Sequence, residues 1–402
     1  MEVIYLNHAA TSWPKPPEVI RRVRETLEAP PVESGRGNGR GADPLRACRE
    51  SLATLFGMRD PSRVVLTAGA THALNLAIVG AVGTLAGAVG TRDGTLETLG
   101  GAPVRCVTSV LEHNSVLRPL RHLERDGRLA LDFLSLDEFR DPAAVARRLR
   151  DGTRLVVLTA ASNVTGARPD LPTVAALCEE AGAILVVDAA QAAGAFPLDM
   201  PSLGPRALVA LAGHKGLLGP AGSGALLVGE GFRDDEVPPL LVGGTGVRSD
   251  LPFQPSEWPL HLEAGTMNLP GFAGLAAGVD LVLGEGVERI GAHRAHLTTL
   301  LLDWLEEIPG VQRHRPLPGE LAAGVAAFNL AGWDPGEAAL VLQESWDIVT
   351  RGGLHCAPLA LPALGWPSGS LRASVGRSST EADVHALVAA VRTLAASSAA
   401  AA

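Results

Sequence analysis

The sequence predicts an α/β fold with a large, mostly parallel sheet and a smaller α+β domain at the C-terminal end. Short apolar runs bounded by turn residues alternate with helical patterns over the first 300 or so residues, as expected for strands joined by helical crossovers. After Pro309 the pattern changes to a shorter unit of strands and helices. An apolar content of 47% is ample for a large core in a chain of 402 residues.

The elements follow one another in a regular order. Strands of the large sheet are predicted at 63–67, 104–108, 129–134, 154–159, 183–188, 207–211 and 224–228. Helices are predicted at 70–85, 115–125, 142–150 and 172–182, followed by two long ones at 270–285 and 288–307. The last unit reads as strand 325–330, helix 335–346, strand 371–375 and helix 380–397. A glycine-rich connection at 86–102 is longer than such connections usually are, and it fits either a mobile flap or a neutral insertion.

These patterns divide the chain into four parts. We expect an N-terminal segment, 1–20, that packs with the small domain, and a large domain over 21–308. The small C-terminal domain is expected over 309–395. The alanine- and serine-rich tail, 396–402, is expected to be disordered.

Charge and composition exclude several classes of partner. A net charge of -9 with scattered basic residues disfavours nucleic acid and anionic membranes as partners. Residues 67–91 carry no charged side chain and are long enough to span a membrane, but they include Thr71, His72 and Asn75, so a buried helix is the better interpretation. No signal peptide is evident at the start, and we expect a cytoplasmic protein.

Lysine is almost absent from this chain. Of 34 basic residues only Lys15 and Lys215 are lysines. Lys15 lies in a proline-rich stretch where any cation would serve, whereas Lys215 lies in an AGHKG sequence between an apolar run and a glycine-rich loop. An amine can lose its proton and condense with an aldehyde, which a guanidinium cannot do. We therefore predict that Lys215 forms a Schiff base.

Among the four cysteines, only Cys356 lies in a predicted loop. Cys48, Cys106 and Cys178 fall within predicted helices or strands and are interpreted as structural. No spacing typical of a metal site occurs, so no metal is expected. A thiol in a loop is more exposed, and the neighbouring His355 can favour its thiolate form.

Polar residues gather where the predicted strands end. Asp188 ends one strand and Asn163 follows another, at the edge where α/β sheets bind ligands. A carboxylate placed there can keep a pyridine nitrogen protonated. Thr71 is near the start of a helix, where backbone N–H groups bind phosphate, and His113 could stack on a planar ring. Each has a plainer alternative: a helix cap for Asp188, a surface histidine for His113 and an ordinary helix start at Thr71.

In its motifs the chain resembles the class V aminotransferase group of pyridoxal-phosphate enzymes, and within it the short-loop, selenocysteine-lyase-like cysteine desulfurases. The matching stretches are 7–16 (NHAATSWPKP), 112–116 (EHNSV), 162–166 (SNVTG), 187–191 (VDAAQ), 213–216 (GHKG), 243–246 (GGTG), 263–266 (EAGT), 351–358 (RGGLHCAP) and 371–374 (LRAS). The resemblance runs from about residue 3 to residue 395.

The resemblance implies a fold-type-I homodimer that binds pyridoxal 5'-phosphate and converts cysteine to alanine. It implies that Lys215 binds the cofactor covalently, Arg372 clamps the substrate carboxylate and Cys356 accepts the sulfur as a persulfide. The implied cofactor-binding residues are Ala70, Thr71, His113, Asn163, Asp188, Gln191, His214, Lys215 and, from the other subunit, Thr266. His113 is also implied in catalysis, Ala10 and Asn163 in substrate binding, and an acceptor protein for the sulfur is a further implied partner.

Some residues depart from the pattern of that family. Ala212 stands where serine or threonine is usual, Asn7 and His8 replace aspartate and asparagine, and Arg377 stands where an aromatic residue is common. The alternatives are a selenocysteine lyase, another pyridoxal-phosphate-dependent carbon–sulfur lyase, or a catalytically silent binding or scaffold protein. A dinucleotide-dependent oxidoreductase is disfavoured, because no GxGxxG follows an N-terminal strand.

Overall fold

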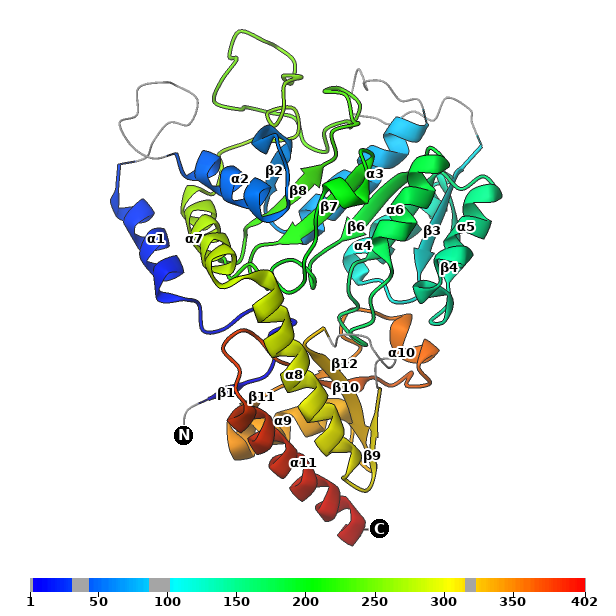
Figure 1. The fold of residues 1–402 in the computed structure, drawn as a ribbon, viewed down its shortest axis with the longest axis vertical. Coiled ribbons are helices and arrows are strands. Elements are labelled where there is room, and N and C mark those ends of the chain that lie inside the picture. Colours follow the sequence, from blue (N-terminus) through cyan, green and yellow to red (C-terminus); the bar gives the residue numbers. More distant parts are fainter. Residues whose placement is uncertain (1–2, 31–42, 87–101, 315–322, 402) are drawn as a thin grey trace.

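A seven-stranded sheet forms the centre of the protein (Figure 1). The structure, a computed structural model, describes residues 3–30, 43–86, 102–314 and 323–401. The strands are β2 (Val64–Thr67), β3 (Val104–Ser109), β4 (Leu129–Leu134), β5 (Leu155–Thr159), β6 (Ile184–Asp188), β7 (Ala207–Ala212) and β8 (Gly224–Val228). Their order is β2-β8-β7-β6-β5-β3-β4, and β8 is antiparallel to both of its neighbours while the other pairs are parallel. The predicted large, mostly parallel sheet is therefore confirmed.

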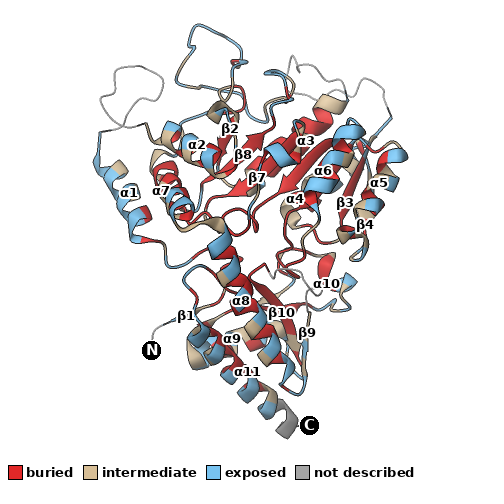
Figure 2. Ribbon diagram, viewed as in Figure 1, coloured by how far each residue is buried: buried red, intermediate tan, exposed pale blue. Residues whose placement is uncertain are grey.

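Helices cover both faces of this sheet, so its central strands are buried throughout (Figure 2). One face packs against α2 (Pro44–Leu55), α5 (Pro142–Arg150), α6 (Leu171–Glu180) and α7 (Leu269–Glu285). The other face packs against α3 (Ala70–Leu85) and α4 (Asn114–Arg125). Successive side chains of a strand point to opposite faces, and in β6 Leu185 and Val187 join the first core while Ile184 and Val186 join the second.

Residue types that favour the start of a helix precede three helices of the large sheet's outer layer. Asp141, Asp170 and Asn268 precede α5, α6 and α7, and each side-chain oxygen accepts a hydrogen bond from a backbone N–H of the first turn. A proline follows within the first two positions of each helix, where its missing N–H is not needed. Local sequence thus fixes these boundaries close to the predicted ones.

A second, four-stranded antiparallel sheet lies below the first in Figure 1. Its order is β12 (Arg351–Gly353), β13 (Ser370–Ser374), β10 (Val325–Leu330) and β9 (Val311–Arg313). A separate apolar core joins this sheet to α8 (Val287–Glu306), α9 (Pro335–Trp346) and α11 (Glu381–Ala401). The structure also has the short helix α10 (Ala360–Ala363) and the 3₁₀ turns η1 (Pro61–Arg63), η2 (Glu138–Arg140) and η3 (Pro201–Leu203).

The N-terminal segment bridges the two sheets. β1 (Ile4–Tyr5) pairs in parallel with β11 (Ile348–Val349), and α1 (Pro17–Glu28) packs against α7. Between them, the backbone of His8 donates to the carbonyl of Ser374 at 3.2 Å, and Ser12 donates to that of His214 at 3.0 Å. Residues 6–15 are thereby held between the two sheets.

The structure differs from the sequence predictions at a few places. The elements α1, β1, β9, β11 and β12 were not predicted, and α11 continues to Ala401 through the tail that we expected to be disordered. Alanine is the best helix former, so an alanine-rich tail prolongs the preceding helix. The 86–102 connection lies almost wholly outside the described residues, and the proposed domain boundaries stay a prediction.

No single helix among the described residues is both long enough and apolar enough to cross a membrane. Only α7 and α8 taken together meet that test by length and composition, and they are bent by 82° where they join.

Candidate active site

The carboxyl ends of the central strands open onto a cavity of about 660 Å³. Thr159 ends β5 and Asp188 ends β6, and both line this cavity together with the start of α3. The predicted site residues that line it are Ala10, Ala70, Thr71, His113, Asn163, Asp188, Gln191, His214, Lys215 and Arg372. The structure thus brings together residues that are up to 362 positions apart, between Ala10 and Arg372.

Lys215 and Asp188 both face this cavity, Asp188 from the end of β6 and Lys215 from the turn that follows β7. Asp188 is buried, and its Oδ1 accepts a hydrogen bond from the backbone N–H of Ala190 at 2.9 Å. Burial lowers the pKa of the Lys215 amine to about 8, although the Asp188 charge opposes this shift. Among the described residues no hydrogen bond joins the two side chains, which leaves both free to contact a group bound between them. A primary amine with this pKa is partly unprotonated near neutral pH.

The peptide group before Lys215 is held by the N-terminal segment. The carbonyl oxygen of His214 accepts from Thr11 Oγ1 at 3.1 Å, from Ser12 Oγ at 3.1 Å and from Lys15 Nζ at 2.9 Å. Lys15 Nζ also donates to Ser12 Oγ at 2.7 Å. Lys15 could not be distinguished from any other cation by its sequence context, and the structure places its amine 2.9 Å from the carbonyl oxygen of the residue before Lys215.

The start of α3 forms one end of the cavity. Gly69 precedes the helix with φ of 143°, a conformation that suits glycine, and the first N–H groups of a helix have no partner within it. Thr71 Oγ1 lies 2.8 Å from Ser115 Oγ, at the start of α4. His113 caps α4 by accepting from the N–H of Ser115 at 3.0 Å, and burial lowers the pKa of His113 to about 4. This end therefore offers neutral donors to an anion.

Arg372 is the largest fully buried side chain in the described part of the chain. It lies on β13, where Nη1 donates to the carbonyl of Asn163 at 3.1 Å and Nη2 donates to Oδ1 of Asn7 at 3.2 Å. Its Nε is buried without a hydrogen-bond partner. No carboxylate of the described chain pairs with it, so the guanidinium keeps capacity for a bound carboxylate.

Cys356 lies on the loop that follows β12, beside the cavity but outside its lining. His355 and Cys356 have φ of 54° and 57°, a left-handed conformation that side chains rarely adopt. The loop is held by Asn163 Nδ2, which donates to the carbonyl of His355 at 2.8 Å, and by the N–H of Asn114, which donates to that of Cys356 at 2.7 Å. Arg351 Nη2 donates to Cys356 Sγ at 3.3 Å. This hydrogen bond orients the sulfur beside the cavity that Arg351 also lines.

The other three cysteines are buried, as predicted from their place in helices and strands. Burial raises the pKa of the Cys178 thiol to about 12 and also raises those of Cys48 and Cys106. Only Cys356 is partly exposed, so it is the one accessible thiol.

Two residues of the site were not singled out from the sequence. Arg351 lines the cavity and contacts Cys356, and Glu112 is fully buried beneath His113. Burial raises the pKa of Glu112 to about 8, while Ser109 Oγ and the N–H of Thr159 donate to its Oε1 at 2.6 and 3.1 Å. Both residues belong to the matching motifs, so that signal was available, but the burial of Glu112 and its contact with Thr159 on another strand could not be predicted locally.

Thr266 differs from the other predicted cofactor-binding residues. It is exposed and does not line the cavity of its own chain. No group of three or more histidine, cysteine or acidic side chains in the described ranges could hold a metal ion.

The arrangement of motifs and cavity agrees with the comparison against known families, in which the class V aminotransferase model matches residues 4–387. The chain belongs to this family. It is 30% identical to a probable cysteine desulfurase of Methanothermobacter thermautotrophicus, over 96% of this chain and 92% of that protein. It is 31% identical to the cysteine desulfurase CsdA of Escherichia coli, over 96% of this chain and 93% of that protein.

Solved structures give the same result for this class V aminotransferase. The apo structure of the cysteine desulfurase from Thermococcus onnurineus aligns with a TM-score of 0.86 and 29% identity, covering 98% of this chain and 95% of that chain. The Escherichia coli CsdA structure aligns with a TM-score of 0.82 and 28% identity, covering 97% and 94% of the two chains. The fold and family that the motifs predicted are therefore confirmed.

Proposed function

We propose that this protein is a pyridoxal-phosphate-dependent cysteine desulfurase, which converts L-cysteine to L-alanine and holds the sulfur on Cys356 as a persulfide. The observation that carries the proposal is an accessible thiol, with an arginine 3.3 Å from its sulfur, beside a cavity that contains Lys215 and Arg372. The relatives named as cysteine desulfurases support the same activity.

The residues present fit pyridoxal phosphate. Lys215 would hold its aldehyde carbon, Asp188 would pair with its ring nitrogen, and His113 would cover one face of the ring. Asn163 and Gln191 are buried polar side chains at the edge of the same cavity. The phosphate would be contacted by Ala70, Thr71 and His214. Ala212, which also lines the cavity, has no hydroxyl to add to these contacts. When bound, the cofactor supplies an electron sink for the substrate Cα.

The protein's own groups then act in turn. Arg372 binds the substrate carboxylate, beside Ala10 and Asn163. The Lys215 amine, with a pKa lowered to about 8 by burial, removes the Cα proton as a general base. The Cys356 thiolate attacks the substrate sulfur, so that a sulfur–sulfur bond forms while the Cβ–S bond breaks. The electron pair of that bond stays on Cβ, which takes up a proton, and Cα regains a proton from Lys215 before the product leaves as alanine.

Two quaternary features belong to the proposal. We propose a homodimer in which Thr266 reaches the cofactor of the other subunit, because Thr266 is exposed and does not line the cavity of its own chain. We also propose an acceptor protein that receives the sulfur, since Cys356 and the exposed Leu354 lie together on an accessible loop. A cytoplasmic location is a further part of the proposal.

The cofactor assignment is tested with Lys215→Ala. We expect the purified protein to be yellow, and we expect this variant to lose the visible absorption band of the covalently held cofactor. Lys15→Ala is the matched control because Lys15 Nζ lies behind the peptide of Lys215 and does not line the cavity. An absorption band unchanged in Lys215→Ala contradicts the assignment.

The desulfurase activity is tested with Cys356→Ser. The variant should still bind cysteine and exchange its Cα proton with solvent, yet lose alanine formation by about a hundredfold or more, because serine neither matches the thiolate as a nucleophile nor holds a persulfide. Mass spectrometry of the wild-type protein after exposure to cysteine should show one added sulfur on the peptide that contains Cys356.

The rival substrates are separated by the same assay. Parallel reactions with cysteine, selenocysteine and cystathionine, measuring alanine, sulfide and pyruvate, distinguish a desulfurase from a selenocysteine lyase or another carbon–sulfur lyase. Intact turnover in Cys356→Ser with no sulfur adduct would favour the plain lyase. No product from any substrate would favour the binding or scaffold alternative, which the intact Lys215, Asp188 and Arg372 oppose.

A further inference from the structure

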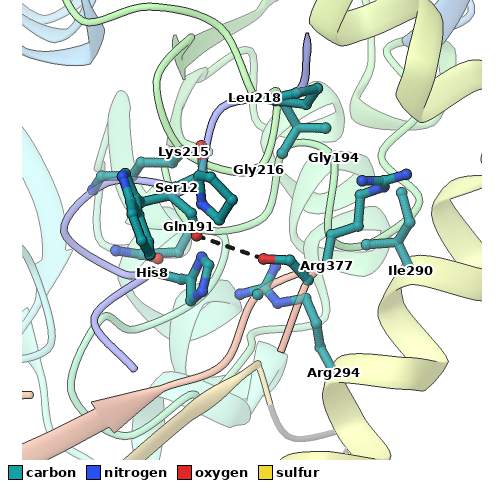
Figure 3. Close-up of a pocket in the computed structure, with 15 residues that line it drawn as sticks. His8, Ser12, Gln191, Gly194, Lys215, Gly216, Leu218, Ile290, Arg294 and Arg377 are labelled. Atoms are coloured by element: carbon teal, nitrogen blue, oxygen red, sulfur yellow. Dashed lines mark hydrogen bonds between the residues drawn. The ribbon is translucent and has the colours of Figure 1, made fainter. Parts of the chain in front are cut away.

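A second cavity lies on the other side of the Lys215 turn (Figure 3). Its volume is about 40 Å³, and its walls come from the N-terminal segment, the start of α8 and the turn after β13. The side chains that define it are His8, Ser12, Gln191, Ile290, Arg294 and Arg377. No acidic residue of the described ranges lines it.

The side chain that indicates a bound ligand in this cavity is Arg294. This arginine of α8 is 7% exposed, and in Figure 3 its guanidinium points into the cavity beside His8. Its Nε donates to the carbonyl of Val375 at 3.3 Å and Nη2 donates to that of Ala323 at 2.9 Å. Nη1 has no hydrogen-bond partner in the described part of the chain, and no carboxylate lies within ion-pair distance.

Another buried arginine of the same chain, Arg49, has a carboxylate partner. Arg49 is also largely buried, and its two terminal nitrogens bind the carboxylate of Glu263 at 2.6 and 2.8 Å. A buried guanidinium without a counter-charge is costly, by several kcal/mol in typical cases, and Arg294 remains charged because burial lowers its pKa only to about 10.

The other charges around the cavity do not neutralise Arg294. Arg377 lies at the exposed rim, where its Nε binds Glu285, so that carboxylate is already paired. His8 is neutral at physiological pH, because burial and the Arg294 charge lower its pKa to about 4. The interior of the cavity is therefore electropositive.

We propose that this cavity binds a small monovalent inorganic anion of about the size of chloride, held by Arg294. A volume of about 40 Å³ accommodates a few water-sized groups, which suits a halide better than an organic carboxylate or a phosphate ester. The anion completes the hydrogen bonding of Nη1 and supplies the missing counter-charge. The proposal does not depend on the reaction that the enzyme catalyses.

Such an anion would connect three parts of the fold. Ser12 belongs to the segment that holds the His214 carbonyl, while Gln191 and Lys215 line both this cavity and the larger one. Binding would tie the N-terminal segment and α8 to the turn that carries Lys215. Because a ligand that binds only the folded state stabilises it, anion binding should be visible as thermal stabilisation.

The test compares thermal unfolding of the holoenzyme in sodium chloride and in sodium isethionate at equal ionic strength, since isethionate is a much larger anion than this volume suits. We expect a saturable rise of about 2 °C in chloride at ten times its dissociation constant. Arg294→Gln should lose the difference between the two salts. Arg377→Gln, at the rim, should keep it.

A second measurement needs no variant. Crystals of the wild-type enzyme soaked in sodium bromide should show an anomalous peak within hydrogen-bond distance of Arg294. Either an equal response to both salts in the wild-type enzyme, or a chloride response that persists in Arg294→Gln, overturns the proposal. An empty cavity in the bromide-soaked crystals does so as well.

Discussion

The two lysines of this chain are linked through a single peptide group. Lys15 Nζ donates to the carbonyl oxygen of His214, and the carbon of that carbonyl is bonded to the backbone nitrogen of Lys215. An ammonium is compact and has three donors, so it can reach Ser12 and His214 together, whereas the planar fork of arginine is longer and differently aimed. This explains why an arginine-rich chain retains lysine at position 15.

We expect Lys15→Met to lower kcat per bound cofactor by about tenfold and to change KM for cysteine little. The substitution keeps the apolar stem and removes a charge-assisted hydrogen bond, of the order of 1.5–3 kcal/mol, that positions the Lys215 peptide. Steady-state kinetics normalised to bound cofactor measure this, and Lys15→Arg should recover only part of the loss. A Lys15→Met enzyme with normal kcat per bound cofactor would show that Lys15 has only a structural role.

At the scale of single residues, the sequence predicted those candidate site residues whose side-chain type alone determines their chemistry. The rarity of lysine pointed to Lys215, and the loop position of Cys356 distinguished it from the buried cysteines. The environments of Glu112 and Arg294 could not be predicted, because burial decides them. Glu112 meets the N–H of Thr159, 47 residues away, and Arg294 meets Val375, 81 residues away.

At the scale of elements, α7 is fitted closely to the turn that carries Lys215. A Cβ on Gly278 of this helix would lie 2.3 Å from the carbonyl oxygen of Leu217 and 3.1 Å from the backbone nitrogen of Gly219. Both neighbours are backbone atoms, which cannot turn aside. The helix can therefore approach the turn only because position 278 lacks a side chain.

We expect Gly278→Ala to destabilise the protein by about 2 kcal/mol, although alanine favours a helix by up to about 1 kcal/mol over glycine. The clash outweighs this gain because the backbone of the turn would have to move. Gly284→Ala in the same helix is the matched control, since no atom lies within 4 Å of the added Cβ, and it should be neutral or stabilising. Denaturant unfolding measures both. Equal stability of the two variants would contradict the close fit.

The elements that the sequence did not predict are those whose stability comes from distant partners. β1 has only two residues and pairs with β11, and Ile4 lies opposite Ile348. A pair of residues carries no periodicity, and the partner strand is equally short, so neither could be recognised locally. The central strands of the large sheet, such as β5 and β6, are apolar runs, and they were recognised because both of their faces are buried.

At the scale of the whole molecule, the segment 240–253 exposes several large apolar side chains. Val242 and Phe253 are 71% and 81% exposed, and Leu240, Leu241 and Leu251 on the same segment are also exposed. This segment leads through the sequence to Thr266, the predicted site residue that lies outside its own cavity. Exposed apolar patches of this kind mark contact surfaces, which supports the proposed homodimer.

We expect Phe253→Asp to raise the dissociation constant of the dimer by about 30-fold or more, because a buried charge at an apolar contact costs at least about 2 kcal/mol. The same variant should bind less cofactor, since Thr266 would no longer reach the other subunit. Light scattering after gel filtration gives the mass, and absorbance gives the cofactor content. Leu340→Asp on α9, also an exposed leucine, should leave both unchanged. A monomeric wild-type protein with a full complement of cofactor would contradict the shared site, and a Phe253→Asp protein that remains dimeric would place the contact elsewhere on the surface.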